Sequence, residues 1–272
     1  MPGGQLSPGL SSILAATREG IAPLRRQYQP LRRAAESAPR RPAMASALAG
    51  RHVAVIAEVK RRSPSAGPIA EQLDPVGHAV AYRSGGAAAV SVLTEGPHFG
   101  GSLNDLAAVA AAVDIPVLRK DFIIDELQVM EARVHGASAV LLIVRALDQV
   151  ALRDLSQTVR DLGLGCLIEV HSLGELDRAL AVEPELVGVN ARDLETFELD
   201  LVSMEPVLRA IPPGVIAVAE SGLATRSDVE RVAAWGADAV LVGTAVSSAR
   251  EPEWAVRALT GVPRLRAGQA AG

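Results

Sequence analysis

From residue 53 onward the chain repeats one pattern eight times: a short apolar run is followed by a longer helix-like segment. Short runs dominated by β-branched and small apolar residues are typical of strands buried on both faces of a parallel sheet. The predicted strands are 53–59, 88–93, 116–119, 138–143, 165–170, 186–190, 215–219 and 239–242. The predicted helices lie near 75–83, 103–112, 126–134, 148–162, 173–181, 203–210, 226–235 and 253–260.

Eight such units predict an α/β fold whose parallel sheet closes into a (β/α)8 TIM barrel. The structural alternative is an open doubly wound sheet, which usually carries a glycine-rich fingerprint in its first turn. The segment KRRSPSAG at 60–67 is not such a fingerprint. We therefore expect one domain over 1–272. It comprises an N-terminal helical extension at 1–52, the barrel at 53–262 and a flexible tail at 263–272.

The first 50 residues are rich in Arg, Ala and Ser and poor in acids. This composition fits an organellar transit peptide. It also fits an amphipathic helix, because Ile13, Leu14, Ile21 and Leu24 form one apolar stripe. Of the two interpretations we favour the helical extension.

Charge and hydropathy exclude two classes of partner. The formal net charge is −4, which gives no indication of nucleic-acid binding. No apolar run reaches the roughly 18 residues that a membrane-spanning helix needs. We expect a cytoplasmic protein that binds neither nucleic acid nor membrane.

Polar residues gather where the predicted strands end, the place where barrel enzymes carry their chemistry. They are Glu58, Lys60, Lys120, Glu169, Asn190 and Glu220. Among 27 basic residues, only Lys60 and Lys120 are lysines. Unlike arginine, lysine can give up a proton in a pocket. Structural ion pairs are the alternative, but amines and carboxylates on converging strand ends indicate general acid–base catalysis.

The seventh and eighth strands run into small residues, ESG at 220–222 and GTA at 243–245. Barrels often bind phosphate there through backbone N–H groups. Residues placed to line such a site are Ser221, Gly222, Gly243 and Thr244, with Ser63 and Arg192 adding a hydroxyl and a fork of donors. A helix N-cap accounts for the Gly-Thr pair about as well. The prediction of a phosphate site therefore rests on the ESG and GTA loops taken together.

These segments together resemble the indole-3-glycerol phosphate synthase family of tryptophan biosynthesis. The segments IAEVKRRSPSAG, LTEGPHFGGS, LRKDFIID, LIEVHSLGEL, VGVNARDLETFELDL and VAESGL occur in the family's order. The resemblance implies a (β/α)8 barrel whose N-terminal helical extension helps to cover the active site. It also implies a carboxy-lyase without metal or cofactor. That enzyme converts 1-(o-carboxyphenylamino)-1-deoxyribulose 5-phosphate to indole-3-glycerol phosphate by ring closure, decarboxylation and dehydration.

The resemblance also implies roles for individual residues. The catalytic positions are Glu58, Lys60, Lys120, Glu169, Asn190, Glu220 and Ser221. Ser63, Arg192, Gly222, Gly243 and Thr244 match positions around the phosphate, and Phe99, Phe122 and Leu141 match positions that hold the anthranilate ring. We expect Lys120 to be the acid in ring closure and Glu169 a base. Lys60 and Glu58 would support dehydration, although the division of steps between the two lysines stays open.

Two other functions are alternatives to this one. Another phosphate-binding barrel lyase or isomerase would not need the set Glu58, Lys60 and Lys120. A non-catalytic paralogue that binds a phosphate ester would be indicated by loss of either lysine. The expected partner is a phosphorylated small molecule, and other tryptophan-pathway enzymes are candidate protein partners.

Histidine and metal chemistry are not expected. His171 follows Glu169 at a strand end, but entry into the next helix explains its position. No His, Cys and Asp residues have the spacing of metal ligands.

Overall fold

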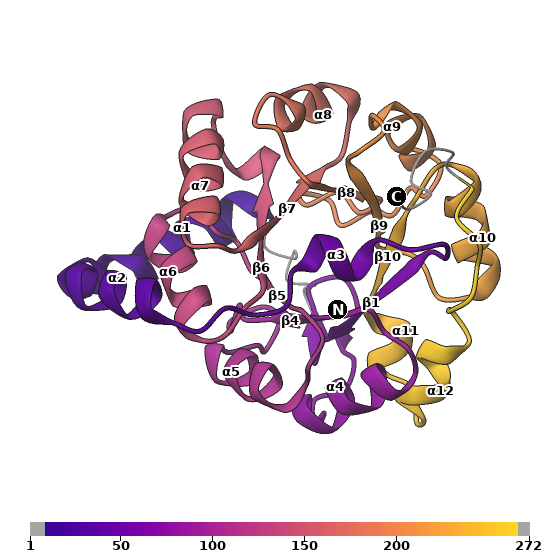
Figure 1. The fold of residues 1–272 in the computed structure, drawn as a ribbon, viewed down its shortest axis with the longest axis horizontal. Coiled ribbons are helices and arrows are strands. Elements are labelled where there is room, and N and C mark those ends of the chain that lie inside the picture. The colour runs from indigo at the N-terminus through magenta and orange to yellow at the C-terminus, as the bar shows by residue number, and fades with distance from the viewer. Residues whose placement is uncertain (1–8, 266–272) are drawn as a thin grey trace, which may run out of the picture.

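Eight parallel strands form a closed barrel in the computed structural model of this chain, which describes residues 9–265 (Figure 1). In order around the barrel they are β1 (Ala54–Val59), β10 (Ala239–Val242), β9 (Ile216–Glu220), β8 (Leu186–Asn190), β7 (Gly165–Val170), β6 (Ala139–Ile143), β5 (Val117–Lys120) and β4 (Ala89–Leu93). Each predicted strand is confirmed to within one residue at either end. The parallel register brings the last residues of neighbouring strands together, as where Asn190 lies opposite Glu220.

A ring of helices surrounds the strands (Figure 1). They are α4 (Pro75–Ser84), α5 (Leu103–Ala112), α6 (Glu126–Val134), α7 (Gln149–Asp161), α8 (Leu173–Leu180), α9 (Met204–Ala210), α10 (Arg226–Ala234) and α12 (Pro252–Arg257). Asp125 and Thr225 start α6 and α10 with capping boxes, which satisfy free N–H groups of the first turn. Valine, leucine and alanine side chains of strands and helices form the larger apolar core between the two layers.

Several short elements were not predicted. They are the hairpin β2 (Arg62–Ser63) with β3 (Gly67–Pro68), the 3₁₀ helix η2 (Val144–Ala146) and the helix α11 (Thr244–Ser247). Elements of two to four residues are too short to show a periodic pattern of apolar residues. All of them follow the carboxyl ends of barrel strands.

The N-terminal extension is helical, as expected, although residues 1–8 lie outside the described part. It consists of α1 (Leu10–Ile21), η1 (Ala22–Gln27), α2 (Tyr28–Ser37) and α3 (Met44–Leu48). Of the predicted stripe, Ile13, Leu14 and Ile21 are buried and Leu24 is half-buried. α1 lies at the carboxyl end of the barrel, because the Leu10 N–H donates to the Leu194 carbonyl at 3.1 Å.

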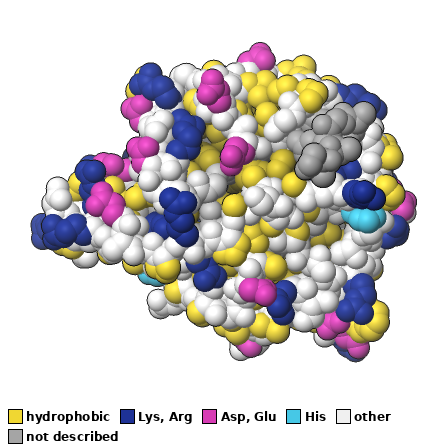
Figure 2. Space-filling view, in the orientation of Figure 1, with side chains coloured by type: hydrophobic (Ala, Val, Ile, Leu, Met, Phe, Trp, Pro, Cys, Tyr) yellow, Lys and Arg dark blue, Asp and Glu magenta, His cyan; other side chains and the backbone are white. Residues whose placement is uncertain are grey.

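α2 packs beside α6, where it projects from the barrel (Figure 1). Arg25 and Asp125 form an ion pair of 2.7 Å at this contact. Figure 2 shows basic and acidic side chains together on the projection, and Arg32 and Glu36 are one such pair. Within residues 9–265, the helices are all too short or too polar to cross a membrane.

α3 covers the amino-terminal end of the barrel, the end that faces the viewer in Figure 1. Its Met44 and Leu48 are 2% and 1% exposed, and Met44 lies against Gly165, the first residue of β7. At the same end the Arg264 N–H donates to the Arg51 carbonyl at 3.0 Å, and Pro263 pairs with His52. These contacts hold the beginning of the expected tail against the barrel, and residues 266–272 lie outside the described part.

Candidate active site

A cavity of about 460 Å³ opens at the carboxyl ends of the strands. All of the residues singled out in the sequence line it. They are Glu58, Lys60, Ser63, Phe99, Lys120, Phe122, Leu141, Glu169, Asn190, Arg192, Glu220, Ser221, Gly222, Gly243 and Thr244. The sequence did not indicate further lining residues, chiefly Leu93, Asp121, Ile143, Leu194, Phe197 and Leu241. Most of these are apolar, and an apolar residue at a strand end cannot be told from core by its type alone.

The end of β1 carries the first charged pair. Lys60 Nζ lies 3.2 Å from Glu58 Oε1, and Ser91 Oγ donates to the other Glu58 oxygen at 3.3 Å. Behind the pair, Ser247 Oγ donates to the Glu58 carbonyl and accepts from the Lys60 N–H. This backbone clamp fixes both side chains toward the cavity.

Lys120 lies between two buried carboxylates. Its Nζ is 3.2 Å from Glu169 Oε2 and 3.4 Å from Glu220 Oε2. Burial alone would lower the pKa of Lys120, but Glu169, Glu220 and Glu58 together raise it above its ordinary value. The ammonium therefore stays charged throughout the physiological pH range. This differs from the lysine of lowered pKa that a pocket was expected to produce, because three carboxylates surround the amine.

The two carboxyl groups beside Lys120 differ in their proton affinity. Burial is the main cause that raises the pKa of Glu220 to about 8, and it is only partly offset by Lys120. Burial acts on Glu169 too, but the charges of Lys120 and His171, with a hydrogen bond from Asn190, lower its pKa below the ordinary value. Of these two groups, Glu220 therefore holds a proton up to a higher pH than Glu169 does.

Apolar side chains from β4 to β6 form one wall of the cavity. Phe99 follows β4 and Phe122 follows β5, and their ring centroids are 6.2 Å apart. Leu141 of β6 is 1% exposed and lines the same cavity. A flat aromatic group would find complementary surface on this wall.

Small residues and one arginine form the wall from β8 to β10. Ser221 and Gly222 both have a φ of +71°, so the chain turns sharply after β9. A side chain on Gly243 would collide with Glu58 and Lys60, which explains the glycine. Arg192 donates to the Phe197 carbonyl at 2.8 Å and forms no ion pair with a carboxylate of residues 9–265. Its guanidinium is therefore available for an anion.

The remaining predicted residues lie beside these walls. Ser63, on the hairpin β2–β3, accepts a hydrogen bond from the Ala66 N–H at 3.2 Å. Asn190 Oδ1 accepts from the Arg192 N–H at 2.9 Å, which ties the end of β8 to the start of its loop. Thr244 is the first residue of α11.

His171 lies at the entry to α8, as interpreted, directly before the N-cap Ser172, but its ring also faces the site, which was not expected. Its side chain is 5% exposed, and its Nε2 lies 3.6 Å from Glu169 Oε1. His171 is two residues beyond Glu169, so the two side chains point to the same side of the chain as β7 ends. The same spacing had identified Glu58 and Lys60, and it was the available signal. In the described part of the chain, no three His, Cys, Asp or Glu side chains are grouped as metal ligands would be.

Comparisons with known proteins show the family of the chain. A family model for indole-3-glycerol phosphate synthase matches residues 10–259. The chain belongs to this family. The indole-3-glycerol phosphate synthase of Beutenbergia cavernae is 47% identical over 265 residues, which cover 95% of this chain and 98% of that protein. Indole-3-glycerol phosphate synthase 1 of Streptomyces coelicolor is 49% identical, covering 87% and 89%. The expected synthase, a carboxy-lyase of tryptophan biosynthesis, is thereby confirmed.

Solved structures confirm the barrel fold. A thiamine phosphate pyrophosphorylase from Pyrococcus furiosus has a TM-score of 0.58 at 16% identity, covering 76% of this chain and 93% of that one. An N-acetylmannosamine-6-phosphate 2-epimerase from Clostridium perfringens has a TM-score of 0.59 at 15% identity, covering 77% and 93%. At such low identity the similarity concerns the fold alone.

Proposed function

We propose that Lys120 is the acid with which this synthase closes the indole ring, and that Glu169 is the base in the loss of water that follows. The observation that carries the proposal is the position of Lys120. It lies between Glu169 and Glu220 in a cavity that has an aromatic wall on one side and an anion-accepting wall on the other.

The two walls orient the substrate. The anthranilate ring lies against Phe99, Phe122 and Leu141, and the phosphate lies near Arg192 and the turn after β9. The ribulose carbonyl between them then comes close to the centre of the mouth, where the lysines are. Positioning of this kind lowers the barrier because the reacting atoms need not find each other.

Ring closure needs an acid at the carbonyl oxygen. The ring carbon that bears the carboxylate attacks the carbonyl carbon, and the oxygen takes up a proton. Three carboxylates keep the Lys120 ammonium charged. Its charge stabilises that oxygen, and its proton is available for the alkoxide. The carboxylate group then leaves as carbon dioxide, and its bonding electron pair restores the aromatic ring.

Loss of water needs an acid and a base at once. The hydroxyl leaves with a proton while a base removes a proton from the adjoining position, which forms the new double bond. Glu169, whose pKa is lowered, serves as the base, and the pair Lys60–Glu58 supports the departure of the hydroxyl. Asn190, Glu220 and Ser221 complete the polar floor around these groups.

The proposal also covers the substrate class, the location of the enzyme in the cell and its protein partners. The substrate is a phosphorylated small molecule, and we place the enzyme in the cytoplasm. Other enzymes of tryptophan biosynthesis are the protein partners to test by co-purification.

A direct assay tests the proposal. Purified protein is mixed with the substrate without added metal or cofactor, and indole fluorescence is followed. We expect turnover in the wild type and its loss in Glu169→Gln. Lys60→Arg should keep part of the ring-closing activity and accumulate a ring-closed intermediate. Full activity of Glu169→Gln would remove Glu169 from the role of base.

A further inference from the structure

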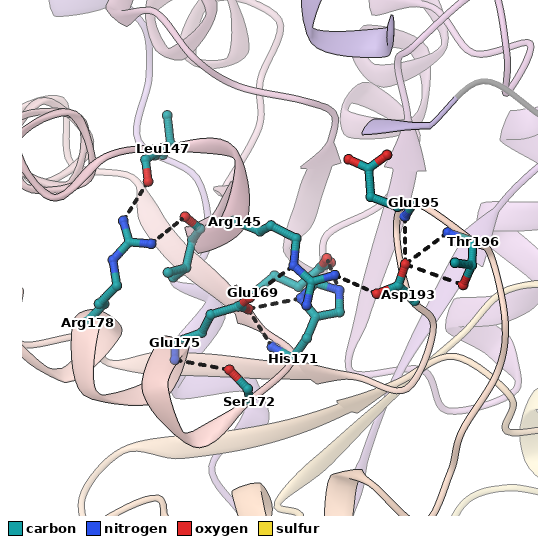
Figure 3. A network of polar contacts seen from close by, with 11 residues as sticks. Arg145, Leu147, Glu169, His171, Ser172, Glu175, Arg178, Asp193, Glu195 and Thr196 are labelled. Carbon is teal, nitrogen blue, oxygen red and sulfur yellow. Dashed lines mark hydrogen bonds and ion pairs between the residues drawn. The ribbon is translucent and has the colours of Figure 1, made fainter. Parts of the chain in front are cut away.

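A chain of ionisable side chains extends from Glu169, away from the cavity, to Asp193 (Figure 3). With Lys120 as the neighbour of Glu169 in the cavity, the order is Lys120, Glu169, His171, Glu175, Arg145 and Asp193. The segments that contribute them are β5, the end of β7, α8, η2 and the loop after β8. Of the six, only Lys120 and Glu169 line the cavity.

His171 is held firmly from the Glu175 side. Glu175 Oε2 accepts the His171 backbone N–H at 2.8 Å and lies 3.1 Å from Nδ1. Burial opposes the charge of Glu175, but hydrogen bonds from His171 and Arg145 lower its pKa to about 2. An ionised carboxylate only accepts hydrogen bonds, so Nδ1 carries a proton.

The other ring nitrogen faces Glu169. His171 Nε2 is buried and has no hydrogen-bond partner within residues 9–265, and Glu169 Oε1 is 3.6 Å away. In a neutral ring protonated on Nδ1, Nε2 would be a bare acceptor directed at a carboxylate. A second proton on Nε2 removes that repulsion and makes the charges along the chain alternate in sign without a break.

We propose that His171 is the positioning residue of Glu169: its doubly protonated ring lies between Glu169 and Glu175 and keeps Glu169 ionised and oriented toward the substrate. His171 does not line the cavity and acts through Glu169. No proton is consumed, because the ring holds the same two protons before and after the reaction. The inference rests on the proposed role of Glu169 as the base.

The far end of the chain supports the same arrangement. Arg145 Nε donates to Glu175 at 3.0 Å and its Nη1 to Asp193 at 2.7 Å. Asp193 in turn accepts the N–H groups of Glu195 and Thr196. The loop that carries the cavity residues Leu194 and Phe197 is thus fixed to the same ion pairs that orient His171.

Nitrogen-15 NMR of the full-length protein tests the state of the ring directly. With labelled histidine at pH 7, we expect His171 to show two protonated nitrogens, assigned by the loss of its signals in His171→Gln. A neutral ring at pH 7 would overturn the proposal. This readout does not depend on catalysis, so it fails or succeeds separately from the role of Glu169.

The pH dependence of kcat tests the function of the ring. Removing a cation beside Glu169 raises the pKa of that base by about one unit, so the acid limb of kcat moves to higher pH. On that limb His171→Gln and His171→Ala should each lose about tenfold in kcat with little change in KM. Glutamine can still donate a hydrogen bond to Glu169. At high pH, the kcat of His171→Gln should therefore be closer to that of the wild type than the kcat of His171→Ala is.

A matched histidine provides the control. His135 ends α6 away from the cavity, and its ring contacts the Glu131 carbonyl at 2.8 Å. His135→Gln should leave kcat and its acid limb unchanged, and melting temperatures identify any unfolded variant. If the acid limb of His171→Gln coincides with that of the wild type, the proposal is wrong. If Glu169→Gln stays active, the proposed base is wrong instead.

Discussion

The two ends of the barrel bury different kinds of side chain: the amino-terminal end is closed by apolar residues, whereas the carboxyl end opens as the mouth of the cavity. At the amino-terminal end, Met44 and Leu48 of α3 pack onto an apolar interior. At the carboxyl end, Glu169 and Glu220 are just as buried, at 1% exposure each, around Lys120. Buried charge costs free energy even when it is paired. The closed end thus stabilises the fold, whereas the mouth gives up stability to hold groups that act on substrate.

The largest effect is expected from Lys120→Arg at the mouth. Arginine keeps the charge, but it does not deprotonate and its planar fork is larger than an ammonium. Loss of a positioned acid typically costs ~10²–10⁴-fold in rate. We expect kcat to fall by at least ~100-fold while the melting temperature changes little. Near-wild-type turnover would mean that charge alone suffices at this position.

Leu48→Ala at the closed, amino-terminal end should lower the stability of the fold and leave kcat unchanged. Truncating a fully buried leucine leaves a cavity and costs about 3 kcal/mol of unfolding free energy. Denaturant unfolding measures the loss, and kcat at a temperature where the variant is folded should not change. Val150→Ala is the control, because Val150 is 57% exposed and its truncation should cost less than about 0.5 kcal/mol. A large fall in kcat would contradict the separation of the two ends.

Arg192→Ala should weaken phosphate binding at the mouth. Loss of a charge-assisted contact is expected to raise KM about tenfold, roughly 1.4 kcal/mol, with a smaller change in kcat. Inorganic phosphate should compete with substrate in the wild type and compete less well in the variant. Arg153→Ala is the control, because Arg153 is exposed and, among residues 9–265, forms an ion pair only with its neighbour Asp154. An unchanged inhibition constant for phosphate would remove Arg192 from the phosphate site.

Glu220→Gln should change how the unfolding free energy depends on pH, which tests the cost of burying a carboxyl group at the mouth. The pKa of Glu220 is about 8 in the folded protein and ordinarily 4.5. Between these values the folded state keeps a proton that the unfolded chain has released, so rising pH destabilises the fold. Glutamine removes this dependence. Relative to the wild type, the variant should gain roughly 3 kcal/mol in unfolding free energy between about pH 5 and pH 8, at about 1.4 kcal/mol per pH unit. A constant difference across this range would show that Glu220 is ionised.

The fold could be predicted because each strand of the barrel is buried on both faces. Runs such as Ala139–Ile143 are apolar throughout, and the helices that follow begin at recognisable caps such as Asp125. The charged floor of the site was also predictable, because Glu58, Lys120 and Glu169 interrupt or end such runs.

The contacts between elements could not be predicted in the same way. The pairing of Arg145 with Glu175 and Asp193 joins η2, α8 and the loop after β8, and periodicity does not say which side chains of different elements meet. The helical extension was predicted as a whole, but the place of α3 at the amino-terminal end of the barrel was not, because its five residues are too few to show an apolar stripe. The raised pKa of Lys120 depends on three carboxylates from three strands, so it follows only from the closed barrel.

The most direct test of the division between the two ends is the double variant Lys120→Arg/Leu48→Ala. Sites that share no contacts have additive effects to within about 0.5 kcal/mol. We expect the double variant to have the kcat of Lys120→Arg and the unfolding free energy of Leu48→Ala. A double variant whose kcat falls well below that of Lys120→Arg, or whose stability loss exceeds that of Leu48→Ala, would show that the two ends are coupled and would contradict this division.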